Sequence, residues 1–339
     1  MATKTNGRMF PRSRRAVITA TGSAVPAQVL DNADLERMVD TSDEWIMTRT
    51  GISERRIASN GETTASLSLA ASRQVLERAG VAAEELDLII CATITPEMVC
   101  PATACFVQEG LGVKGCGAFD LAAACSGFTY AMATGAAFIG TGQNKNVLVI
   151  GAETLSHITD YTDRSSCILF GDGAGAVLLQ SEEDTDDGLL YSSTHADGAA
   201  WETISCQAHG SRFPINNGLD DPKKCYLNVR GRETYQTAVR TIVDLIEQVY
   251  RTCNVTTEDI GLIIPHQSNV RIVESVAKRL NVGTEKFFVN IERYGNTSAA
   301  SIPIALNEAV EGGHVKKGDL VLLVAFGAGL TWGVNLIRY

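Results

Sequence analysis

An internal repeat constrains the fold of this chain more than any other feature of its sequence. When the chain is aligned with itself at an offset of 174 residues, several separate elements come into register. A constant offset across separate elements indicates two related halves, and a chance likeness between two α/β units is the alternative. The elements in register are the helix ends at 80–81 and 254–255, the apolar segments 86–90 and 260–264, and the apolar segments 147–150 and 321–324.

Both halves follow the same order of expected elements. Each has a helix, an apolar strand, a loop with polar residues, a further strand, a helix of small residues and a second apolar strand. Continuous apolar strands that alternate with helices are typical of a mainly parallel sheet that is buried on both faces. At 339 residues the chain is long for one core, and we expect two α/β halves packed together, over residues 16–185 and 186–339.

The first fifteen residues differ from the rest of the chain. They contain five basic residues, and no acidic residue precedes Asp31. A transit peptide is one interpretation, but the segment is short and lacks the apolar core of a secretory signal. We therefore expect a flexible basic arm over residues 1–15.

A cysteine lies where the first small-residue helix begins. The run 119–128 reads FDLAAACSGF, an apolar strand that turns directly into a helix with Cys125 in its first turn. Free amides and partial positive charge at a helix N-terminus favour a thiolate, so Cys125 is a candidate nucleophile. The alternative is an inert, buried cysteine. The repeat places Ala299 over Cys125, so only one half carries the nucleophile.

The helix after Cys125, over about residues 126–140, is apolar or small on every side. A helix of this composition should be fully buried. Because its alanines and glycines let backbones approach closely, we expect it in a central layer between two sheets.

The second half places two polar residues in its loops. His266 directly follows the apolar strand 262–264, and Asn296 lies in the loop before the second small-residue helix. Ligands and catalytic groups gather at the carboxyl ends of strands in α/β sheets. A thiol can accept an acyl group while an imidazole and a carboxamide donate hydrogen bonds to a carbonyl that develops negative charge. The alternatives are a core histidine for His266 and a turn residue for Asn296.

Two glycine-rich segments lead to different predictions. Residues 326–330 follow the last strand of the repeat, and small residues let backbone N–H groups point into a site, as an oxyanion hole requires. A plain tight turn is the alternative. Residues 171–176 lead into a strand instead of a helix. Dinucleotide phosphates bind at a helix N-terminus, so this segment is not a Rossmann fingerprint.

Composition argues against several classes of function. Hydrophobic residues make up 45% and charged residues 20%, and no uncharged apolar run reaches the roughly 18 residues of a membrane span. The net charge of -10 argues against general nucleic-acid binding, which needs clustered lysine and arginine. The nine cysteines are odd in number, scattered and without a C-x-x-C pair. They favour free thiols in a reducing compartment over disulfides or structural zinc.

With these residues the chain resembles the β-ketoacyl-[acyl-carrier-protein] synthase III enzymes, which have the thiolase-like fold. The likeness spans about residues 17–339. It implies two pseudo-symmetric α/β halves packed as a layered α-β-α-β-α sandwich. The motifs that carry it are DTSDEWI at 40–46, TRTGI at 48–52, AAACSGF at 122–128, PHQ at 265–267, YGNTS at 294–298 and FGAGLTWG at 326–333.

The combination of cysteine, histidine and asparagine separates close relatives. The resemblance implies that elongating synthases carry a cysteine and two histidines, whereas thiolases carry a second cysteine. Asn296 therefore indicates the initiating branch. Papain-like proteases share the three residue types, but their cysteine lies in another motif and their fold lacks this repeat.

The resemblance implies a role for each residue of the site. Cys125 is acylated by acetyl-CoA or a similar primer, with the backbone amides of Cys125 and Ala328 as the oxyanion hole; the family usually has glycine in place of Ala328. His266 and Asn296 stabilise the enolate that forms when malonyl-acyl carrier protein loses carbon dioxide. That carbanion attacks the acyl-Cys125 thioester and yields a 3-oxoacyl-carrier protein. The reaction implied requires no metal and no organic cofactor.

The resemblance also implies contacts with the substrates. Arg271, Lys278 and Arg279 share one face of the expected helix after His266 and form a docking patch for the acidic carrier protein; a solvated helix face is the alternative. Cys100 stands where the family often has a bulky aromatic from the partner subunit, so we expect the acyl pocket to accept longer or branched primers. The expected coenzyme A contacts are Thr41, Trp45, Arg49, Arg164, Gly231, Ser268 and Asn269, with Trp45 and Arg164 on either side of the adenine.

These observations lead to one main hypothesis and two alternatives. We expect a homodimeric, cytoplasmic condensing enzyme that initiates fatty-acid synthesis from an acyl-CoA and malonyl-acyl carrier protein. A related enzyme that loads starters or transfers acyl groups in secondary metabolism is one alternative. An inactive subunit that binds acyl carrier protein is the other, although the presence of all three polar residues argues against it.

Overall fold

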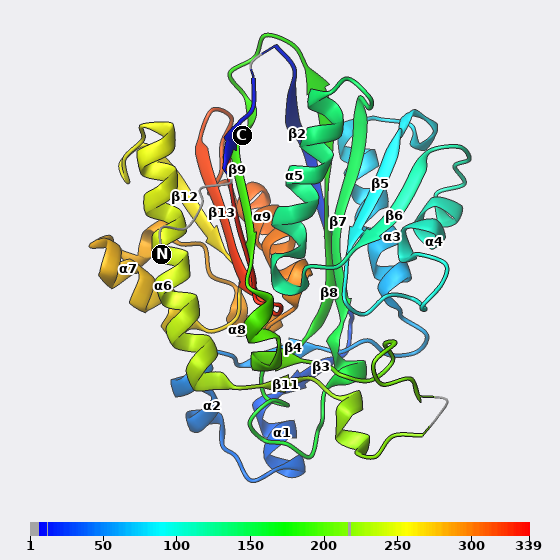
Figure 1. Ribbon diagram of the computed structural model, residues 1–339, viewed down its shortest axis with the longest axis vertical. Coiled ribbons are helices and arrows are strands. Elements are labelled where there is room, and N and C mark those ends of the chain that lie inside the picture. Colours follow the sequence, from blue (N-terminus) through cyan, green and yellow to red (C-terminus); the bar gives the residue numbers. More distant parts are fainter. Residues whose placement is uncertain (1–6, 12, 216–217) are drawn as a thin grey trace.

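Two five-stranded sheets form the centre of the computed structural model, which describes residues 7–11, 13–215 and 218–339 (Figure 1). The long strands of each sheet come from one half of the chain. The first sheet has the order β2-β8-β7-β5-β6, with bounds Arg15–Ala24, Asp172–Glu182, Asn146–Thr154, Leu88–Ala92 and Gly117–Leu121. The second has the order β1-β9-β14-β13-β12, with bounds Arg8–Met9, Gly188–Ala196, Thr331–Arg338, Leu320–Gly327 and Ile260–Pro265.

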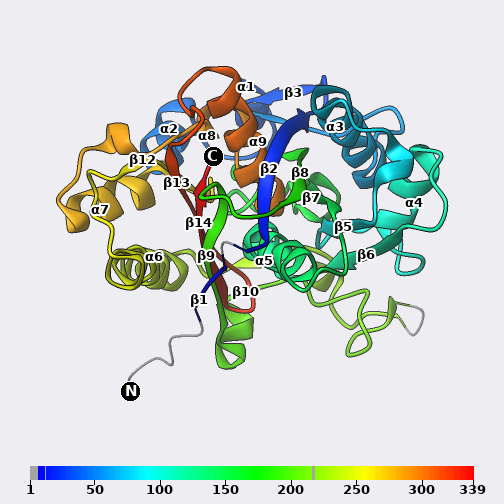
Figure 2. The same ribbon diagram turned by 90° about the horizontal axis from the view of Figure 1, so that it is seen from above.

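Helices complete the layers on and between these sheets (Figures 1 and 2). The helices between the sheets are α5 (Gly127–Gly140) and α9 (Ser301–Glu311). Those outside the first sheet are α3 (Thr64–Ala79) and α4 (Thr103–Gly110), and those outside the second are α6 (Gly231–Cys253) and α7 (Val270–Leu280). This arrangement is the predicted α-β-α-β-α sandwich.

Shorter elements complete the described structure. The short helices are α1 (Asn32–Met38), α2 (Asp43–Thr50) and α8 (Ile291–Tyr294). One ribbon pairs β3 (Val29–Asp31) with β4 (Glu54–Arg56), and another pairs β10 (Ile204–Ser205) with β11 (Asn228–Val229).

Alternating side chains of the strands join the layers. In β5, Leu88 and Ile90 pack toward the central helices, whereas Ile89 and Cys91 pack toward α3 and α4. This pattern explains why the strands read as continuous apolar runs, since both of their faces are buried. The central helix α5 begins and ends close to the predicted bounds, but its last turn reaches the surface, where Ala137 is exposed.

The sheets are mixed, and the prediction of mainly parallel sheets is wrong. β5 is parallel to β6 and β7, and β12 is parallel to β13. By contrast, β8 and β14 run antiparallel to both of their neighbours. Parallel neighbours need a crossover connection, whereas β14 follows β13 through a tight turn at 328–330, so the chain reverses its direction there.

The repeat holds in three dimensions at the offset of 174 residues seen in the sequence. α3 and α6 are both capped by a residue in the left-handed region, Gly80 with a φ of 64° and Asn254 with a φ of 54°. The matching starts are Asn146 and Leu320 for β7 and β13, Gly127 and Ser301 for α5 and α9, and Ala124 and Ser298 for the short 3-10 turns before these helices.

The described part of the N-terminal segment belongs to the sheets. β1 pairs Arg8 and Met9 with Ser192 and Tyr191 of β9, and Arg15 is the buried first residue of β2. These contacts differ from the flexible arm expected over residues 1–15, because backbone pairing holds part of that segment. Residues 1–6 and 12 lie outside the described residues.

Candidate active site

One cavity of about 160 Å³ is lined by both halves of the chain. Its wall includes Cys125 from the first half and His266, Asn296 and Ala328 from the second. The structure thus brings together the four residues that the sequence analysis placed at one site. Much of the remaining wall is apolar and includes Ile94, Leu155, Leu169, Phe170, Ile204, Leu227 and Val229.

A sharp turn positions Cys125 at this cavity. The residue lies in the single 3-10 turn Ala124–Ser126, between β6 and α5. Ala124 has a φ of 46°, in the left-handed region that alanine rarely adopts. The end of β13 passes close behind the turn, since a Cβ on Gly327 would lie 2.8 Å from the Cys125 backbone nitrogen. Packing from the second half therefore supports this turn of the first half.

The Cys125 thiol is less acidic than its place before a helix predicted. Burial raises the pKa of Cys125 to about 11, and the charge of Glu153 adds to the rise. The Ser298 hydroxyl and the backbone amides of Cys125 and Ala328 act in the opposite direction without cancelling it. The prediction that the site favours a thiolate is wrong for the free protein, because desolvation outweighs the amides.

His266 is a buried, neutral imidazole at the end of β12. Its backbone N–H donates to the carbonyl of Val324 in β13 at 2.8 Å, and burial lowers the pKa of the ring to about 3. The Oγ of Ser301 lies 2.7 Å from His266 Nδ1 and accepts the N–H of Gln267 at 3.3 Å. With the serine hydroxyl donating to Nδ1, the ring proton belongs on Nε2, so the imidazole can donate a hydrogen bond from Nε2.

Asn296 is fixed by the backbone around it. Its own N–H donates to the carbonyl of Leu169 at 2.8 Å, and its Oδ1 accepts the N–H of Ser298 at 2.9 Å. The carboxamide NH2 is then the group that can donate to a ligand. Gly295 has a φ of 63° and a ψ of -157°, and a Cβ there would lie 2.8 Å from the Leu169 carbonyl oxygen. Only glycine suits this turn into Asn296.

Three polar residues at or beside the site were missed in the sequence. Ser301 holds His266, and Ser298 lines the cavity with a φ of 47°, where its hydroxyl favours the charged forms of Cys125 and Glu153. Glu153 is fully buried and accepts hydrogen bonds from the 93–95 loop, and burial raises its pKa to about 7. As the one charged residue in the apolar strand β7, Glu153 did offer a signal.

The expected coenzyme A contacts form two groups. Gly231, Ser268 and Asn269 line the cavity. Trp45, Arg49 and Arg164 lie together at α2, and the guanidinium carbons of Arg49 and Arg164 are each 4.8 Å from the centroid of the Trp45 ring. The Asn269 side chain donates to the Arg49 carbonyl at 2.9 Å and joins the two groups.

The adenine site expected between Trp45 and Arg164 is closed in this conformation, because the two side chains contact each other directly. An adenine ring can enter only if they separate. Arg164 is also held by a hydrogen bond of 2.6 Å from its Nη1 to the Asp40 carbonyl. Thr41, the next residue, has a buried hydroxyl without a hydrogen-bond partner in the described part of the chain.

Cys100 does not line the cavity of its own chain. It is exposed and follows Met98 and Val99, which are 46% and 90% exposed. An exposed apolar stretch of this kind is typical of a contact with another molecule. The expected role of Cys100 in an acyl pocket therefore stays a prediction.

The three residues of the expected docking patch are exposed on α7, which begins directly after Ser268 and Asn269 of the cavity wall. They are Arg271, Lys278 and Arg279.

Within the described residues, no group of three or more histidine, cysteine or acidic side chains is placed to hold a metal ion. All nine cysteines are free. The described helices include none whose length and apolar character would allow it to cross a membrane.

Known proteins resemble this chain in sequence over nearly its whole length. Residues 119–198 match the family of 3-oxoacyl-[acyl-carrier-protein (ACP)] synthase III, and residues 251–339 match the C-terminal part of the same family. A β-ketoacyl-[acyl-carrier-protein] synthase III from Aquifex aeolicus is 50% identical, covering 95% of this chain and 99% of the relative. Another from Roseiflexus castenholzii is 49% identical, covering 96% and 98%.

Solved structures give the same result. The 3-oxoacyl-[acyl-carrier-protein] synthase III of Aquifex aeolicus superposes with a TM-score of 0.88 and 49% identity, covering 96% of this chain and 100% of the other. The β-ketoacyl-[acyl carrier protein] synthase III of Thermus thermophilus gives a TM-score of 0.89 and 42% identity, covering 95% and 99%. A priming β-ketosynthase of the R1128 polyketide pathway gives 0.88 and 32%, covering 96% and 97%.

Proposed function

The chain belongs to the β-ketoacyl-[acyl-carrier-protein] synthase III family and is a condensing enzyme of fatty-acid synthesis, and we propose that the cavity at Cys125, His266 and Asn296 is its active site. The observation that supports this assignment is the shared cavity, in which one half supplies a thiol and the other supplies two hydrogen-bond donors. An acyl transfer that passes through a thioester needs these groups within reach of one substrate.

In the first step Cys125 takes the acyl group from acyl-CoA. The sulfur attacks the thioester carbonyl, and the backbone N–H groups of Cys125 and Ala328 stabilise the oxyanion of the tetrahedral intermediate. The carbon–sulfur bond to coenzyme A then breaks, and coenzyme A leaves as a thiol with the proton that Cys125 has lost. Ala328 serves this role as well as glycine would, because the contact is made by the backbone.

In the second step the malonyl group of the carrier protein loses carbon dioxide. The electron pair of the broken carbon–carbon bond forms an enolate, whose oxygen accepts hydrogen bonds from His266 Nε2 and the Asn296 NH2. A neutral imidazole suits this role, because burial lowers the pKa of His266 to about 3. The enolate carbon attacks the acyl-Cys125 carbonyl, the carbon–sulfur bond to Cys125 breaks, and the sulfur leaves as a thiolate that takes a proton from solvent. The reaction as proposed uses no metal ion and no organic cofactor.

The substrates are an acyl-CoA and malonyl-acyl carrier protein. We place coenzyme A along Thr41, Trp45, Arg49, Arg164, Gly231, Ser268 and Asn269, and the carrier protein on Arg271, Lys278 and Arg279. A local basic patch is needed because the chain has a net charge of -10 and its carrier protein is acidic.

A homodimer is part of this proposal. The exposed apolar residues Met98 and Val99 provide a surface for a second copy, which would bring Cys100 to the partner's acyl pocket. A cysteine leaves more room than an aromatic ring, so primers longer than acetyl or branched should be accepted. The free cysteines fit the reducing interior of a cell, and we place the enzyme in the cytoplasm.

The test combines mass spectrometry with a product assay. The purified protein is mixed with acetyl-CoA and longer or branched acyl-CoAs, and malonyl-acyl carrier protein is then added. We expect a gain of one acyl group on Cys125, followed by release of carbon dioxide and formation of a 3-oxoacyl-carrier protein. Acylation without condensation would favour a starter-loading acyltransferase, and no acylation by any acyl-CoA would favour an inactive carrier-binding subunit. Strict selectivity for acetyl-CoA would contradict the larger acyl pocket.

A further inference from the structure

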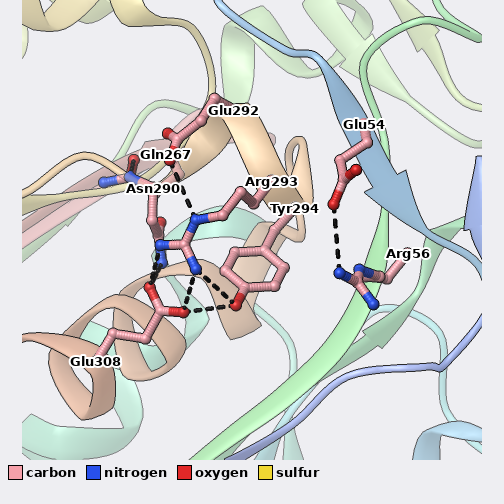
Figure 3. Close-up of polar contacts among 8 residues, drawn as sticks. All are labelled: Glu54, Arg56, Gln267, Asn290, Glu292, Arg293, Tyr294 and Glu308. Atoms are coloured by element: carbon pink, nitrogen blue, oxygen red, sulfur yellow. Dashed lines mark hydrogen bonds and ion pairs between the residues drawn. The ribbon is translucent and has the colours of Figure 1, made fainter. Parts of the chain in front are cut away.

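A carboxylate on the central helix α9 holds the segment that leads to Asn296 (Figure 3). Glu308 accepts hydrogen bonds from Arg293 Nη1 and Nη2 at 2.9 and 2.8 Å. It also accepts one from Asn290 Nδ2 at 2.8 Å and one from the Tyr294 hydroxyl. One side chain thus satisfies donors from three residues of the segment 290–294.

This segment ends directly at the proposed active site. Tyr294 is followed by Gly295, which makes the sharp turn into Asn296. Because glycine is flexible, the turn alone does not fix the segment before it, so residues 290–294 need contacts of their own to α9. The Glu308 contacts supply that constraint on the side before the turn, and the pairing of Asn296 with residues 169–171 supplies it on the side after the turn.

The same cluster reaches the loop of His266. The Gln267 Oε1 accepts the backbone N–H of Asn290 at 3.1 Å, and its Nε2 donates to the Pro265 and Phe288 carbonyls at 2.8 and 3.0 Å. At the first turn of α9, Ser301 contacts His266 Nδ1. Helix α9 therefore holds both donor residues of the proposed active site, His266 through Ser301 and the Asn296 segment through Glu308.

Electrostatics favours the charged form of this carboxylate. Burial alone would raise the pKa of Glu308, but the hydrogen bonds from Arg293, Tyr294 and Asn290 outweigh it and lower the pKa. On the other side of the pair, the hydrogen bond to Glu308 raises the pKa of Arg293. A charge-assisted pair with two parallel N–H···O bonds fixes direction as well as distance.

We propose that Glu308 is a positioning residue for the decarboxylation step: it ties the segment 290–294 to α9 and so keeps the Asn296 carboxamide aligned with His266. This inference rests on the proposed function of His266 and Asn296. The acylation of Cys125 should not depend on Glu308, because it relies on the first half and on the backbone near Ala328, which Glu308 does not contact. The two half-reactions, acylation and decarboxylation, should therefore respond differently to a change of Glu308.

The test is Glu308→Gln, with the half-reactions measured separately. Gln keeps the size of the side chain but loses the charge, and its NH2 would oppose the Asn290 and Arg293 donors. We expect kcat for decarboxylation of malonyl-acyl carrier protein to fall about tenfold, since small misplacements of catalytic groups are costly. The KM for malonyl-acyl carrier protein and the rate of Cys125 acylation should change by less than about twofold.

Glu311→Gln is the matched control. Glu311 lies on the same helix and pairs with Arg78 instead of the 290–294 segment, so both half-reactions should remain within about twofold of the unaltered protein. If Glu308→Gln fails to fold, Tyr294→Phe removes the two hydrogen bonds of the Tyr294 hydroxyl, to Glu308 and from Arg293 Nη1, and keeps the charge pair. It should lower decarboxylation about twofold to threefold and leave acylation unchanged.

The outcomes separate this inference from the proposed function. If the unaltered protein does not decarboxylate malonyl-acyl carrier protein, the proposed function fails. If it does, and if Glu308→Gln or its substitute Tyr294→Phe leaves decarboxylation unchanged or lowers both half-reactions equally, the positioning role of Glu308 is overturned. A selective loss of decarboxylation supports it.

Discussion

The two halves of the molecule share a backbone and divide between them the polar groups of the proposed active site. The 3-10 turns that precede α5 and α9 begin at Ala124 and Ser298, which have nearly the same left-handed φ of 46° and 47°. The side chains at equivalent positions of the repeat differ. At the offset of 174 residues Cys125 aligns with Ala299, His266 aligns with Ala92 and Asn296 aligns with Ala122. In each pair one half holds a side chain of the proposed active site and the other holds alanine. Single side chains on a repeated backbone frame therefore make the shared cavity asymmetric.

The halves also differ at one sheet edge. In the first half β6 pairs in parallel with β5. The equivalent residues 291–295 of the second half form α8 and the turn at Gly295 instead of a strand. Asn296 follows this segment directly, so the second half replaces an edge strand with the loop that brings its carboxamide to the cavity.

Of the changes that test this division between the halves, Cys125→Ala should have the largest effect on activity. Without sulfur no acyl-enzyme can form, so condensation should fall by at least about 10³-fold. Decarboxylation of malonyl-acyl carrier protein should persist, because its donors belong to the other half. Intact-protein mass spectrometry and carbon dioxide release measure the two steps. Loss of decarboxylation together with acylation would show that the division of chemistry is incorrect.

His266→Ala and Asn296→Ala are the reverse experiment. Each removes one donor to the enolate oxygen, and decarboxylation should fall about 10²- to 10³-fold, the usual cost of a lost oxyanion donor. Cys125 should still be acylated at a rate within several fold of the unaltered protein. Ala92→Gly and Ala122→Gly alter the matching positions of the first half and serve as controls. Full condensation in either donor variant would remove that residue from the proposed mechanism.

The pH dependence of Cys125 alkylation tests whether burial raises the pKa of the thiol that the first half supplies. A folded-state pKa raised to about 11 means that the thiol stays protonated at neutral pH. Alkylation by iodoacetamide should therefore rise about tenfold per pH unit from pH 7 to 10, as the thiolate fraction does. His266 titrates near pH 3 and cannot cause this rise. A rate that levels off below pH 8 would mean that the helix amides prevail after all.

The sequence predicted the frame and the residues that meet in the shared cavity, because both leave local signals. The repeat is visible in apolar strands and helix ends, and Cys125, His266 and Asn296 stand in motifs of a known family. Strand direction left no such signal, since an apolar run reads alike in parallel and antiparallel pairs. In the structure, the turn at 328–330 brings β14 back antiparallel beside β13.

The supporting residues of the site escaped prediction because they act at long range in the chain. Ser301 is 35 residues from His266, and Glu153 is 58 residues from Thr95, to which it is hydrogen bonded. The acidity of Cys125 depends on desolvation, which no local motif reports. These features need the packed structure, since each arises where distant elements meet.

Substitutions at the two residues that cap α3 and α6 should have the smallest effect, because they change the backbone strain alone. Gly80 and Asn254 occupy the same left-handed position after α3 and α6, and a Cβ on Gly80 would meet no atom within 4 Å. Gly80→Asn should therefore lower the free energy of unfolding by about 0.5–1 kcal/mol through backbone strain only, and Asn254→Gly should raise it by a similar amount. Urea unfolding measures both as shifts of the midpoint at constant slope. Changes of the same sign would mean that the halves do not share their backbone at this point, since a duplicated frame must respond to the two exchanges in opposite directions.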